Sequence, residues 1–520
     1  MKKIRSNFAL LMICSFLLQI AICPVIATQN EEINTELVSE MRGIWVASVY
    51  NLDYPAKQTT EVSKLKEEAI KILDDTKDLG LTAVFLQVRP TADSLYKSEI
   101  FPWSRYLTGK NGRAPENGFD PLEFWIEEAH KRGLELHAWI NPYRVTKNGD
   151  DEYKEMSNNS PAKKNPEYLV KYTDNNYYFN PGIPEVRELV INGIVEIINN
   201  YEVDGIHMDD YFYPGTDFND NETFIKYKNG YTNIDDWRRN NVDLLVKGIA
   251  DKINQIDSTI EFGISPAGIW ANKSSNELGS KTNGTQSYYQ HYADTRKWVL
   301  EEWIDYIAPQ IYWEVGHKVA DYEELVNWWT NTVKGTNTDL YIGMADYKTI
   351  DVSKTSVWYG GKEIEKQLNL NDNYNEIKGE IHYRYASLKE DKNLYNKVKQ
   401  YYASKKIEVY VEGNEVLFDQ EPLIKDGRTL VPIRKIFEAL NAKVAWNSKN
   451  NSVVVTKGET EIKFTIGNKK MIVNGKEKIL DVEAQLIGGR TLVPLRAISE
   501  AMDLNVNWNS ITKIINIFRK

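Results

Sequence analysis

Two hydrophobic periodicities alternate along residues 41–402. Short apolar runs, several of them alternating with polar residues, predict strands, and longer stretches with an apolar residue every three or four positions predict amphipathic helices. The eight predicted strands are Arg42–Ser48, Thr82–Val88, Leu134–Ile140, Gly205–Asp209, Glu261–Ser265, Tyr306–Tyr312, Leu340–Ala345 and Glu380–Tyr385. The helices predicted between them include Val62–Leu79, Pro121–Lys131, Pro184–Asn200 and Ile234–Ile256.

This repeated order predicts an α/β fold, specifically a TIM (β/α)8 barrel over residues 41–402, because eight such units in about 360 residues suit that fold. The links from helix to strand are short ("DLGL", "KRGL"), whereas the links that follow the second to fifth strands are long. In this fold the strand-to-helix loops carry the active site. We therefore expect the functional residues at the carboxyl ends of the strands.

Alternation within the strands predicts which side chains face the barrel interior. The apolar set of each strand is expected to face the helices, and the opposite set to point inward. The inward sets are Phe85, Gln87 and Arg89; His137, Trp139 and Asn141; His207 and Asp209; and Gln310, Tyr312 and Glu314. Such sets fit a substrate pocket, and the alternative interpretation is a satisfied buried network.

Residues 406–520 differ in composition, with short Val- and Ile-rich runs and many Lys and Asn residues. The segment "DGRTLVPIRKIFEALNAKVAWN" (Asp426–Asn447) recurs 62 residues later as "GGRTLVPLRAISEAMDLNVNWN" (Gly488–Asn509). Each copy predicts a strand, a helix and a strand that ends near a Trp. The sequence thus predicts a smaller α+β repeat domain after the barrel, with the boundary near residues 403–406.

Residues 1–27 have the pattern of a secretory signal peptide, with Lys2, Lys3 and Arg5 before an apolar run and "VIA" before the expected cleavage point. A lipoprotein signal using Cys23 is the alternative, although Ile22 is bulky for that pattern. Both cysteines of the chain, Cys14 and Cys23, lie in this segment. We expect a secreted or wall-associated protein without disulfides, and no later apolar run is long enough to cross a bilayer.

Removal of three positive charges with the signal takes the formal net charge from −10 to −13. This acidic balance argues against nucleic acid as a partner and remains compatible with a neutral or weakly anionic glycan. The oxygen-rich "DFNDNE" (residues 217–222) lacks the glycine and terminal acid of a calcium loop. No phosphate-binding glycine loop, nucleophile elbow or dinucleotide motif is present. We therefore expect no metal site and no cofactor.

The stretch "VDGIHMDDYFYP" (Val203–Pro214) carries the strongest chemical signal. Two carboxylates followed by aromatic rings, where a buried strand ends, are typical of glycoside cleavage, which needs two acidic groups and flat faces for sugars. Asp209 is the first candidate catalytic residue and Asp210 the second, with a helix N-cap as the plain alternative. Because adjacent strand residues point to opposite sides, we expect another carboxylate from a different strand. Glu314 is the candidate, and Asp93 and Asp346 are its rivals.

The remaining candidates would bind substrate. Arg89 and Arg144 are suited to clamp a sugar carboxylate, unless they form internal ion pairs. His137 and His207 are candidate donors to sugar hydroxyls, unless they are structural. The other candidates are the polar side chains of Asp93, Asn141 and Gln310, and the rings of Trp103, Trp139, Tyr143, Tyr211, Tyr213, Tyr312 and Trp313.

The motifs "MRGIWVAS", "FLQVRPTADSLYKSEIFPWSRYLTG", "HAWINPYR", "DGIHMDDYFYP" and "APQIYW" resemble the glycosyl-hydrolase-like family 10 of bacterial envelope proteins. The resemblance covers the whole predicted barrel and implies hydrolysis of cell-wall glycan, including peptidoglycan strands stripped of their peptides. Asp209 is similar in position to the fourth-strand nucleophile of the α-amylase clan. The repeat resembles the copper amine oxidase N-terminal-like domain, but it contains no His or Cys, so it implies no copper site.

The leading hypothesis is an exported glycoside hydrolase acting on wall glycan, with the repeat domain attaching to the wall. Substrate-assisted cleavage through an N-acetyl group is a variant, although Tyr211 stands where family-18 chitinases carry their acid. The alternative of another class is a non-catalytic glycan-binding or wall-organising protein.

Overall fold

The computed structural model describes residues 40–210, 212–425, 428–447, 449–487, 489–509 and 513–519. The predicted signal peptide, residues 1–27, and the candidate Tyr211 lie outside the described residues. In the part of the chain that is described, no helix combines the length and the apolar character that a membrane crossing requires.

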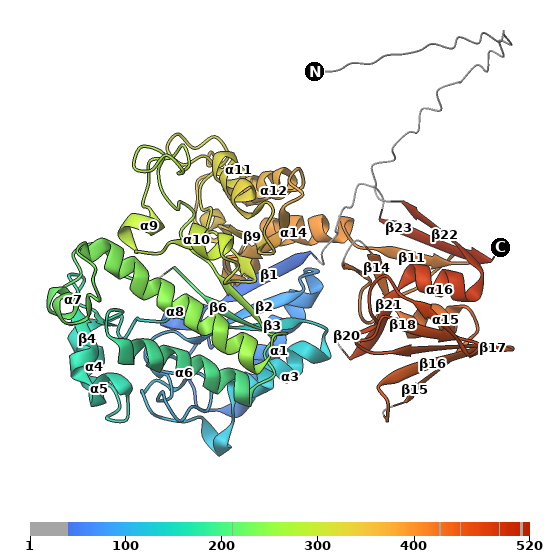
Figure 1. Ribbon diagram of the computed structural model, residues 1–520, viewed down its shortest axis with the longest axis horizontal. Helices are drawn as coiled ribbons and strands as arrows, with labels where there is room; N and C mark the ends of the chain where they lie inside the picture. Colours follow the sequence, from blue (N-terminus) through green and yellow to red (C-terminus); the bar gives the residue numbers. More distant parts are fainter. Residues whose placement is uncertain are drawn as a thin grey trace, which may run out of the picture. The chain divides into compact units, whose positions relative to one another are not determined.

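Eight parallel strands close into a barrel in the order β1-β10-β9-β8-β7-β6-β3-β2 (Figure 1). The strands are β1 (Met41–Val46), β2 (Ala83–Arg89), β3 (Glu135–Ile140), β6 (Gly205–Met208), β7 (Glu261–Ile264), β8 (Tyr306–Ile307), β9 (Asp339–Met344) and β10 (Ile377–His382). The predicted TIM barrel is confirmed, because each strand pairs in parallel with both neighbours and helices separate consecutive strands.

The main covering helices are α1 (Val62–Asp78), α3 (Pro121–Lys131), α6 (Pro184–Asn200), α8 (Ile234–Ile256), α10 (Thr295–Leu300), α11 (Tyr322–Val333), α12 (Lys362–Asn371) and α14 (Lys392–Ser404). Three of the four predicted helices have the predicted bounds, and α1 ends one residue early. Local chemistry explains the start of α3: the Asp120 carboxylate accepts the backbone N–H of Leu122, and Pro121 occupies the first turn, where no N–H is needed.

Short elements fill the long loops at the carboxyl ends of the strands. They are α2 (Arg105–Thr108), α4 (Gly149–Glu155), α5 (Pro161–Lys164), the hairpin β4 (Leu169–Lys171) with β5 (Tyr177–Phe179), α7 (Asn221–Tyr227), α9 (Ser287–Gln290), α13 (Tyr385–Glu390) and the 3₁₀ turns η1 (Val49–Asn51), η2 (Glu116–Gly118), η3 (Pro166–Tyr168), η4 (Asp346–Thr349) and η5 (Tyr359–Gly361). The loop elaboration is thus on the face where the sequence predicts the site.

Two predicted strands differ from the structure by more than two residues at one or both ends, and the other six differ by one or two residues. The sixth was expected over Tyr306–Tyr312, but β8 contains only Tyr306 and Ile307. Pro309 has no N–H to donate to the ladder, so only isolated bridges at Gln310 continue it. The last was expected over Glu380–Tyr385, whereas β10 starts at Ile377 and ends at His382.

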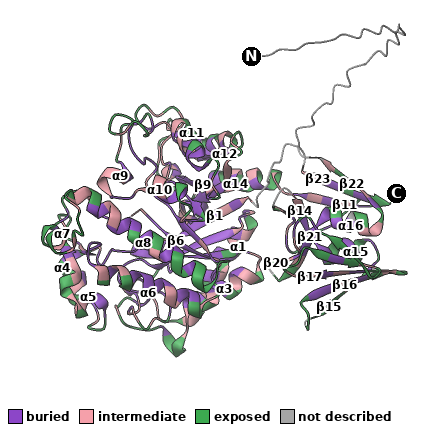
Figure 2. Cartoon of the chain, in the orientation of Figure 1, coloured by how far each residue is buried: buried purple, intermediate pink, exposed green. Residues whose placement is uncertain are grey.

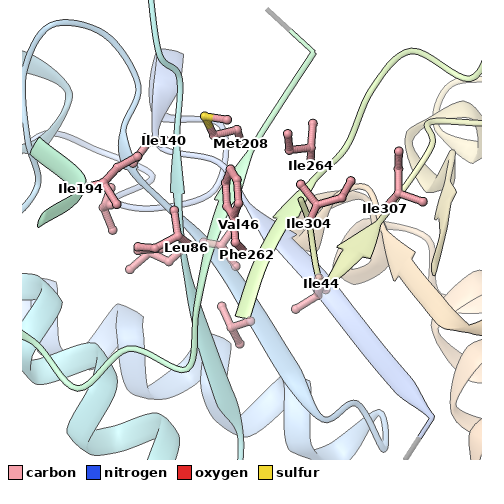
Figure 3. Close-up of a cluster of buried hydrophobic side chains, with 14 of the residues drawn as sticks. Ile44, Val46, Leu86, Ile140, Ile194, Met208, Phe262, Ile264, Ile304 and Ile307 are labelled. Atoms are coloured by element: carbon pink, nitrogen blue, oxygen red, sulfur yellow. The ribbon is translucent and has the colours of Figure 1, made fainter. Parts of the chain in front are cut away.

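Two apolar layers hold the barrel together. Outward-facing strand residues pack against the helices; Figure 3 shows Leu86, Ile140 and Met208 near Ile194 of α6. Figure 2 shows the strands as mostly buried, while α6 and α8 have one buried face and one exposed face. A second cluster fills the barrel interior. It comprises Met41, Trp45, Ala47, Ala83, Phe85, Trp139, Tyr306, Ala308, Tyr341 and Ile381.

A hydrogen-bond chain crosses this interior. The Trp45 indole N–H donates to His207 Nε2 (3.1 Å), so Nδ1 of His207 carries its proton and donates to the Tyr306 hydroxyl (3.1 Å). Tyr306 in turn donates to His137 Nδ1 (3.0 Å), which leaves the Nε2–H of His137 facing Glu135, 3.8 Å away. Gly205 makes room for this arrangement, because a Cβ there would lie 2.2 Å from His137 Nδ1.

Residues after α14 build a separate apolar core from three sheets. Their elements are β11 (Glu408–Val411), β12 (Asn414–Glu415), β13 (Leu423–Lys425), β14 (Arg428–Pro432), α15 (Ile433–Ala439), β15 (Lys443–Asn447), β16 (Ser452–Lys457), β17 (Thr460–Thr465), β18 (Lys470–Val473), β19 (Lys476–Ile479), β20 (Gln485–Ile487), β21 (Arg490–Pro494), α16 (Leu495–Met502), β22 (Leu504–Asn509) and β23 (Ile514–Arg519). The chain thus ends in the smaller sheet-rich domain that was predicted.

The two "RTLVP" strands, β14 and β21, pair antiparallel with Val431 opposite Val493. Arg428 binds Asp481 and Arg490 binds Asp419, each at 2.6 Å. Both the arginines and the aspartates are 62 positions apart. In each of these two equivalent ion pairs, the arginine of one repeat unit therefore binds the aspartate of the other.

Candidate active site

Asp209 and Asp210 lie where β6 opens into its loop. The strand ends at Met208, one residue earlier than predicted, so strict alternation no longer separates the two carboxylates. The Asn141 side-chain amide, just after β3, donates to both oxygens of Asp209 at 2.9 and 3.1 Å. The side-chain oxygen Oδ1 of Asn141 accepts the backbone N–H of Arg144 (3.0 Å). Two adjacent strands thus supply a carboxylate, its amide donor and a nearby cation.

Burial sets the protonation of Asp209. The residue is only 3 % exposed, and this burial raises its pKa to about 6, against the opposing charge of Arg144 and with the support of the negative charge of Asp210. With a pKa of about 6, the Asp209 carboxyl is mostly ionised at neutral pH.

Asp210 is more accessible than Asp209 and has different neighbours. Burial raises its pKa as well, while the charge of His291 and a hydrogen bond from Gln310 act in the opposite direction. Gln310 is itself held, because its side-chain N–H donates to the Ser265 carbonyl (2.9 Å).

Arg144 brings positive charge to both carboxylates. Its Nε–H donates to the Pro90 carbonyl (2.9 Å), and its charge acts on Asp209 and Asp210. Lys147 adds a second cation, and burial lowers its pKa. The predicted place of Arg144 at the site is consistent with this geometry.

Tyrosine rings border the site formed by Asp209, Asp210 and Arg144. Tyr312 stacks on Tyr383 with ring centres 6.0 Å apart and meets Tyr347 edge-on at 5.7 Å. Burial raises the pKa of Tyr383 to about 12, and the negative charges of Asp53 and, to a smaller extent, Asp209 add to this effect. Tyr50 is half-exposed under the Lys147 ammonium, which is 5.6 Å from its ring centre. Tyr50, Tyr347 and Tyr383 were missed; the available signal was their place just after the first, seventh and eighth strands.

The two histidines predicted to bind substrate do not reach this site. His137 and His207 are completely buried, and their ring nitrogens bond to Tyr306, Trp45 and Ser265. Their predicted role as donors to sugar hydroxyls is therefore wrong, because the hydrogen-bond chain of the interior uses them. The structural alternative holds for both.

Arg89 and Tyr143 also point elsewhere. The pairing of β2 with β3 shifts between Gln87 and Arg89, which turns Arg89 away from the interior. Its guanidinium packs over the Phe101 ring and against Gly193 of α6. Tyr143 is fully buried in the outer apolar layer. The structure therefore contradicts the prediction that Arg89 clamps a substrate from the barrel interior. It also contradicts the prediction that sugars stack on Tyr143 or Tyr213, because Tyr213 is buried in the same layer.

The three candidates for a further carboxylate are dispersed. Asp346 is sealed in the interior, where His382 Nδ1 donates to it at 2.9 Å. Asp93 is buried beside Ser104 and Thr91, and burial raises its pKa to about 6. Glu314 is half-buried and its charge acts on Lys348. Among the described residues, no contact joins any of the three to Asp209 or Asp210.

The remaining predicted rings differ in exposure. Trp139 lies beside Asp209 but is 5 % exposed, whereas Trp103 and Trp313 are half-buried. In the oxygen-rich segment 217–222, Asp220 is buried in an ion pair with Arg238 (2.6 Å). This pair engages the carboxylate that would otherwise be best placed to bind a metal ion. Within the described ranges, no group of three His, Cys, Asp or Glu side chains is placed to hold a metal ion.

Two known proteins are similar to this chain in sequence. Glycosyl hydrolase YngK of Bacillus subtilis (strain 168) is 45% identical over 361 residues, 68% of this chain and 70% of that protein. Glycosyl hydrolase DigH of Escherichia coli (strain K12) is 42% identical over 364 residues, 66% of this chain and 82% of that protein.

Among solved structures, the PgaB (BpsB) glycoside hydrolase domain from Bordetella bronchiseptica has a TM-score of 0.45 at 12% identity, covering 69% of this chain and 98% of that one. The model of the copper amine oxidase N-terminal domain matches residues 410–517. The glycosyl hydrolase-like 10 model matches residues 40–359, and the chain belongs to this family.

Proposed function

We propose that this protein is an exported glycoside hydrolase that cleaves bacterial cell-wall glycan, meaning peptidoglycan strands or a related polysaccharide. The single observation that carries the proposal is the carboxylate pair Asp209–Asp210, set beside a cation and a border of tyrosine rings. Membership of the family and the long loops on this face support the same activity.

In this mechanism Asp209 is the carboxylate that faces the reacting sugar carbon. The Asn141 amide holds both of its oxygens, which fixes its direction without a metal ion. A fixed anion stabilises the positive charge that develops on the sugar ring in the transition state. Asp210, which is closer to solvent, donates its proton to the glycosidic oxygen as the bond from the sugar carbon to that oxygen breaks. Water then adds to the sugar carbon and returns a proton to Asp210.

The rings and the cations would select the substrate. Tyr312 and Tyr383 offer flat faces to pyranose rings. Arg144 and Lys147 would favour a sugar that bears a carboxylate, such as the lactyl group of N-acetylmuramic acid. Export by residues 1–27 and attachment of residues 406–520 to the wall would place the enzyme at this substrate.

The deciding experiment is incubation of the full chain with purified wall glycan from which an amidase has removed the peptides. We expect new reducing ends and short saccharides in the mass spectrum, whose masses identify the bond that is cut. A protein that sediments with the glycan but releases nothing would favour the alternative, a non-catalytic glycan-binding or wall-organising protein.

A further inference from the structure

A groove on the outer wall of the barrel is bounded by α10, α11 and the loop that follows β7. Its volume is about 470 Å³, within the range of roughly 300–1,000 Å³ that is usual for ligand sites. Arg296 and Leu300 of α10, Trp328 of α11 and Leu278 of the loop line it. Among the described residues that line this groove, none belongs to the candidate active site.

Trp328 gives the groove a rigid aromatic wall. Its indole N–H donates to the Leu278 carbonyl oxygen (2.8 Å), and its ring is nearly parallel to that of Trp270, with ring centres 5.7 Å apart. Trp329 meets the same ring edge-on at 4.8 Å. The half-buried Trp328 ring is thus held in one orientation beside the exposed side chains of Leu278 and Leu300. A fixed ring among apolar side chains suits the apolar face of a sugar.

The guanidinium of Arg296 brings charge to the groove. The residue is half-buried, and its Cζ lies 5.9 Å from the centre of the Trp270 ring. Within the described ranges, no carboxylate or carbonyl oxygen accepts a hydrogen bond from this guanidinium. Its five N–H donors are therefore available to an anion, and a partly buried cation without a partner is unfavourable until such an anion binds.

The other polar groups of the groove suit the rest of a saccharide. Among the described residues, Lys334 forms no ion pair, so the lining carries two cations against one carboxylate, that of Glu324. Glu324 already accepts the backbone N–H of Lys281 (2.9 Å). The Asn331 side chain donates to the Asn327 carbonyl oxygen (2.7 Å) and can offer its own Oδ1 to sugar hydroxyls. The groove is thus locally positive in a chain whose net charge is −10.

We propose that this groove is a second glycan-binding site, which holds an acidic polysaccharide on the barrel wall without cleaving it. The Trp328 ring lies under a sugar ring, and the Arg296 guanidinium binds the carboxylate or phosphate group that the polysaccharide carries. The inference goes beyond the proposed function, because it concerns binding at other residues and does not require that the protein cleave glycan.

Two substitutions isolate the charge of the groove. Arg296→Gln removes the guanidinium and keeps most of the side-chain length, so the protein should fold normally. Lys64→Gln, at an exposed ion pair of α1, removes one positive charge elsewhere and is the matched control. Both changes are made in the full chain that also carries Asp209→Asn, so that the glycan used as probe stays intact.

The measurement is hydroxyl-radical oxidation of Trp328, read by mass spectrometry, with increasing amounts of soluble peptide-free wall glycan. We expect the glycan to protect Trp328. Arg296→Gln should raise the glycan concentration for half-protection by about 10- to 100-fold, the loss of a charged hydrogen bond, and Lys64→Gln should leave it unchanged. Oxidation that glycan does not reduce, or an unchanged half-point in Arg296→Gln, overturns the inference.

Further probes identify the group that Arg296 binds. Peptide-free wall glycan presents carboxylates, a wall polymer with phosphodiester links presents phosphates, and chitin oligosaccharides present neither. Protection by one acidic polymer at lower concentration than by the other names the anion. Equal protection by chitin oligosaccharides would contradict the role of Arg296, and equal protection by polyglutamate would overturn the assignment to a saccharide.

Turnover tests the proposed function separately. With Asp209 intact, Arg296→Gln should leave kcat/KM on short soluble glycans unchanged, because the groove holds only the polymer. A fall in this value equal to the loss of binding would assign Arg296 to the catalytic site and overturn the inference of a second site. Absence of wild-type turnover would refute the proposed function and leave the protection of Trp328 to decide the binding site.

Discussion

Each end of the barrel interior holds an acid whose pKa is raised towards neutrality by burial, but the two acids have different surroundings. At the carboxyl end, burial raises the pKa of Asp209 to about 6, beside Arg144 and a border of tyrosines. At the amino end, burial raises the pKa of Glu261 to about 7, and Glu135, Asp339 and Asp305 add to the effect. The comparison teaches that a shifted pKa by itself does not identify a catalytic group.

The difference lies in the loops and in the compensating charge. Long strand-to-helix loops bring Arg144, Lys147 and His291 to the carboxyl end. Short helix-to-strand turns lie at the amino end, where the charge of His137 lowers the pKa of Glu261 against the larger effect of burial. Under the proposed function, desolvation at the carboxyl end supports chemistry, whereas at the amino end it destabilises the folded protein above neutral pH.

The largest expected effect is at Asp209. Asp209→Asn removes the charge but keeps the shape and one acceptor for Asn141, so the protein should fold and still bind glycan. We expect release of reducing ends to fall by about 10³-fold or more. Asp251→Asn, on the exposed face of α8, is the matched control. Undiminished turnover in Asp209→Asn would show that this residue takes no part in the mechanism. The proposed functional difference between the carboxyl end and the amino end of the barrel would then be lost.

Arg144→Gln should have the next largest effect. The charge of Arg144 lowers the pKa of Asp209, so its removal should move the corresponding limb of the kcat/KM profile to higher pH. Loss of a charged hydrogen bond to substrate should also lower kcat/KM by roughly 10- to 100-fold, mainly through KM. Arg239→Gln, a surface pair with Asp236, serves as the comparison. An unmoved limb would show that Arg144 does not act on the catalytic carboxyl.

Glu261→Gln tests the amino end through stability. The folded-state pKa of Glu261, about 7, is above its usual value of 4.5, so its favourable contribution is complete below pH 4.5 and is lost as the pH rises towards 7. The variant should match the wild type at low pH and exceed its free energy of unfolding by up to about 3 kcal/mol at pH 8. Denaturant unfolding at several pH values measures this. Glu127→Gln, on the exposed face of α3, is the control and should leave the pH dependence of the free energy of unfolding unchanged. A large loss of turnover in Glu261→Gln would contradict the interpretation that the acid of the amino end is not catalytic.

The smallest effect on chemistry is expected from truncation after Ala403. Because residues 407–517 have their own apolar core, the barrel should keep its fold and cleave short soluble glycans at nearly the full rate. Sedimentation with whole cell walls should weaken if the C-terminal domain attaches there. Unchanged sedimentation would refute the attachment and place all glycan contact in the barrel.

Local sequence pattern was sufficient for the elements and their order. Helix bounds such as Pro121–Lys131 follow from a capping aspartate, a first-turn proline and the apolar period, all of which act within a few residues. The position of Asp209 at a strand end, with Asn141 and Arg144 after the neighbouring strand, also followed from alternation and chain order. The exceptions are instructive, since Pro309 shortened β8 by removing a ladder donor.

What only the tertiary structure decided is which polar side chains reach solvent. A shift in strand pairing turned Arg89 outward, and a chain of partners from distant strands enclosed His137 and His207 in the interior. The His291 ring is held by a carbonyl 78 positions away in the chain, at Tyr213. The sequence by itself determined the period of each element and the chemistry at each strand end, because those depend on near neighbours. Burial and pairing depend on residues that meet only when the barrel closes, and these decided which of the candidate acids, cations and rings form one site.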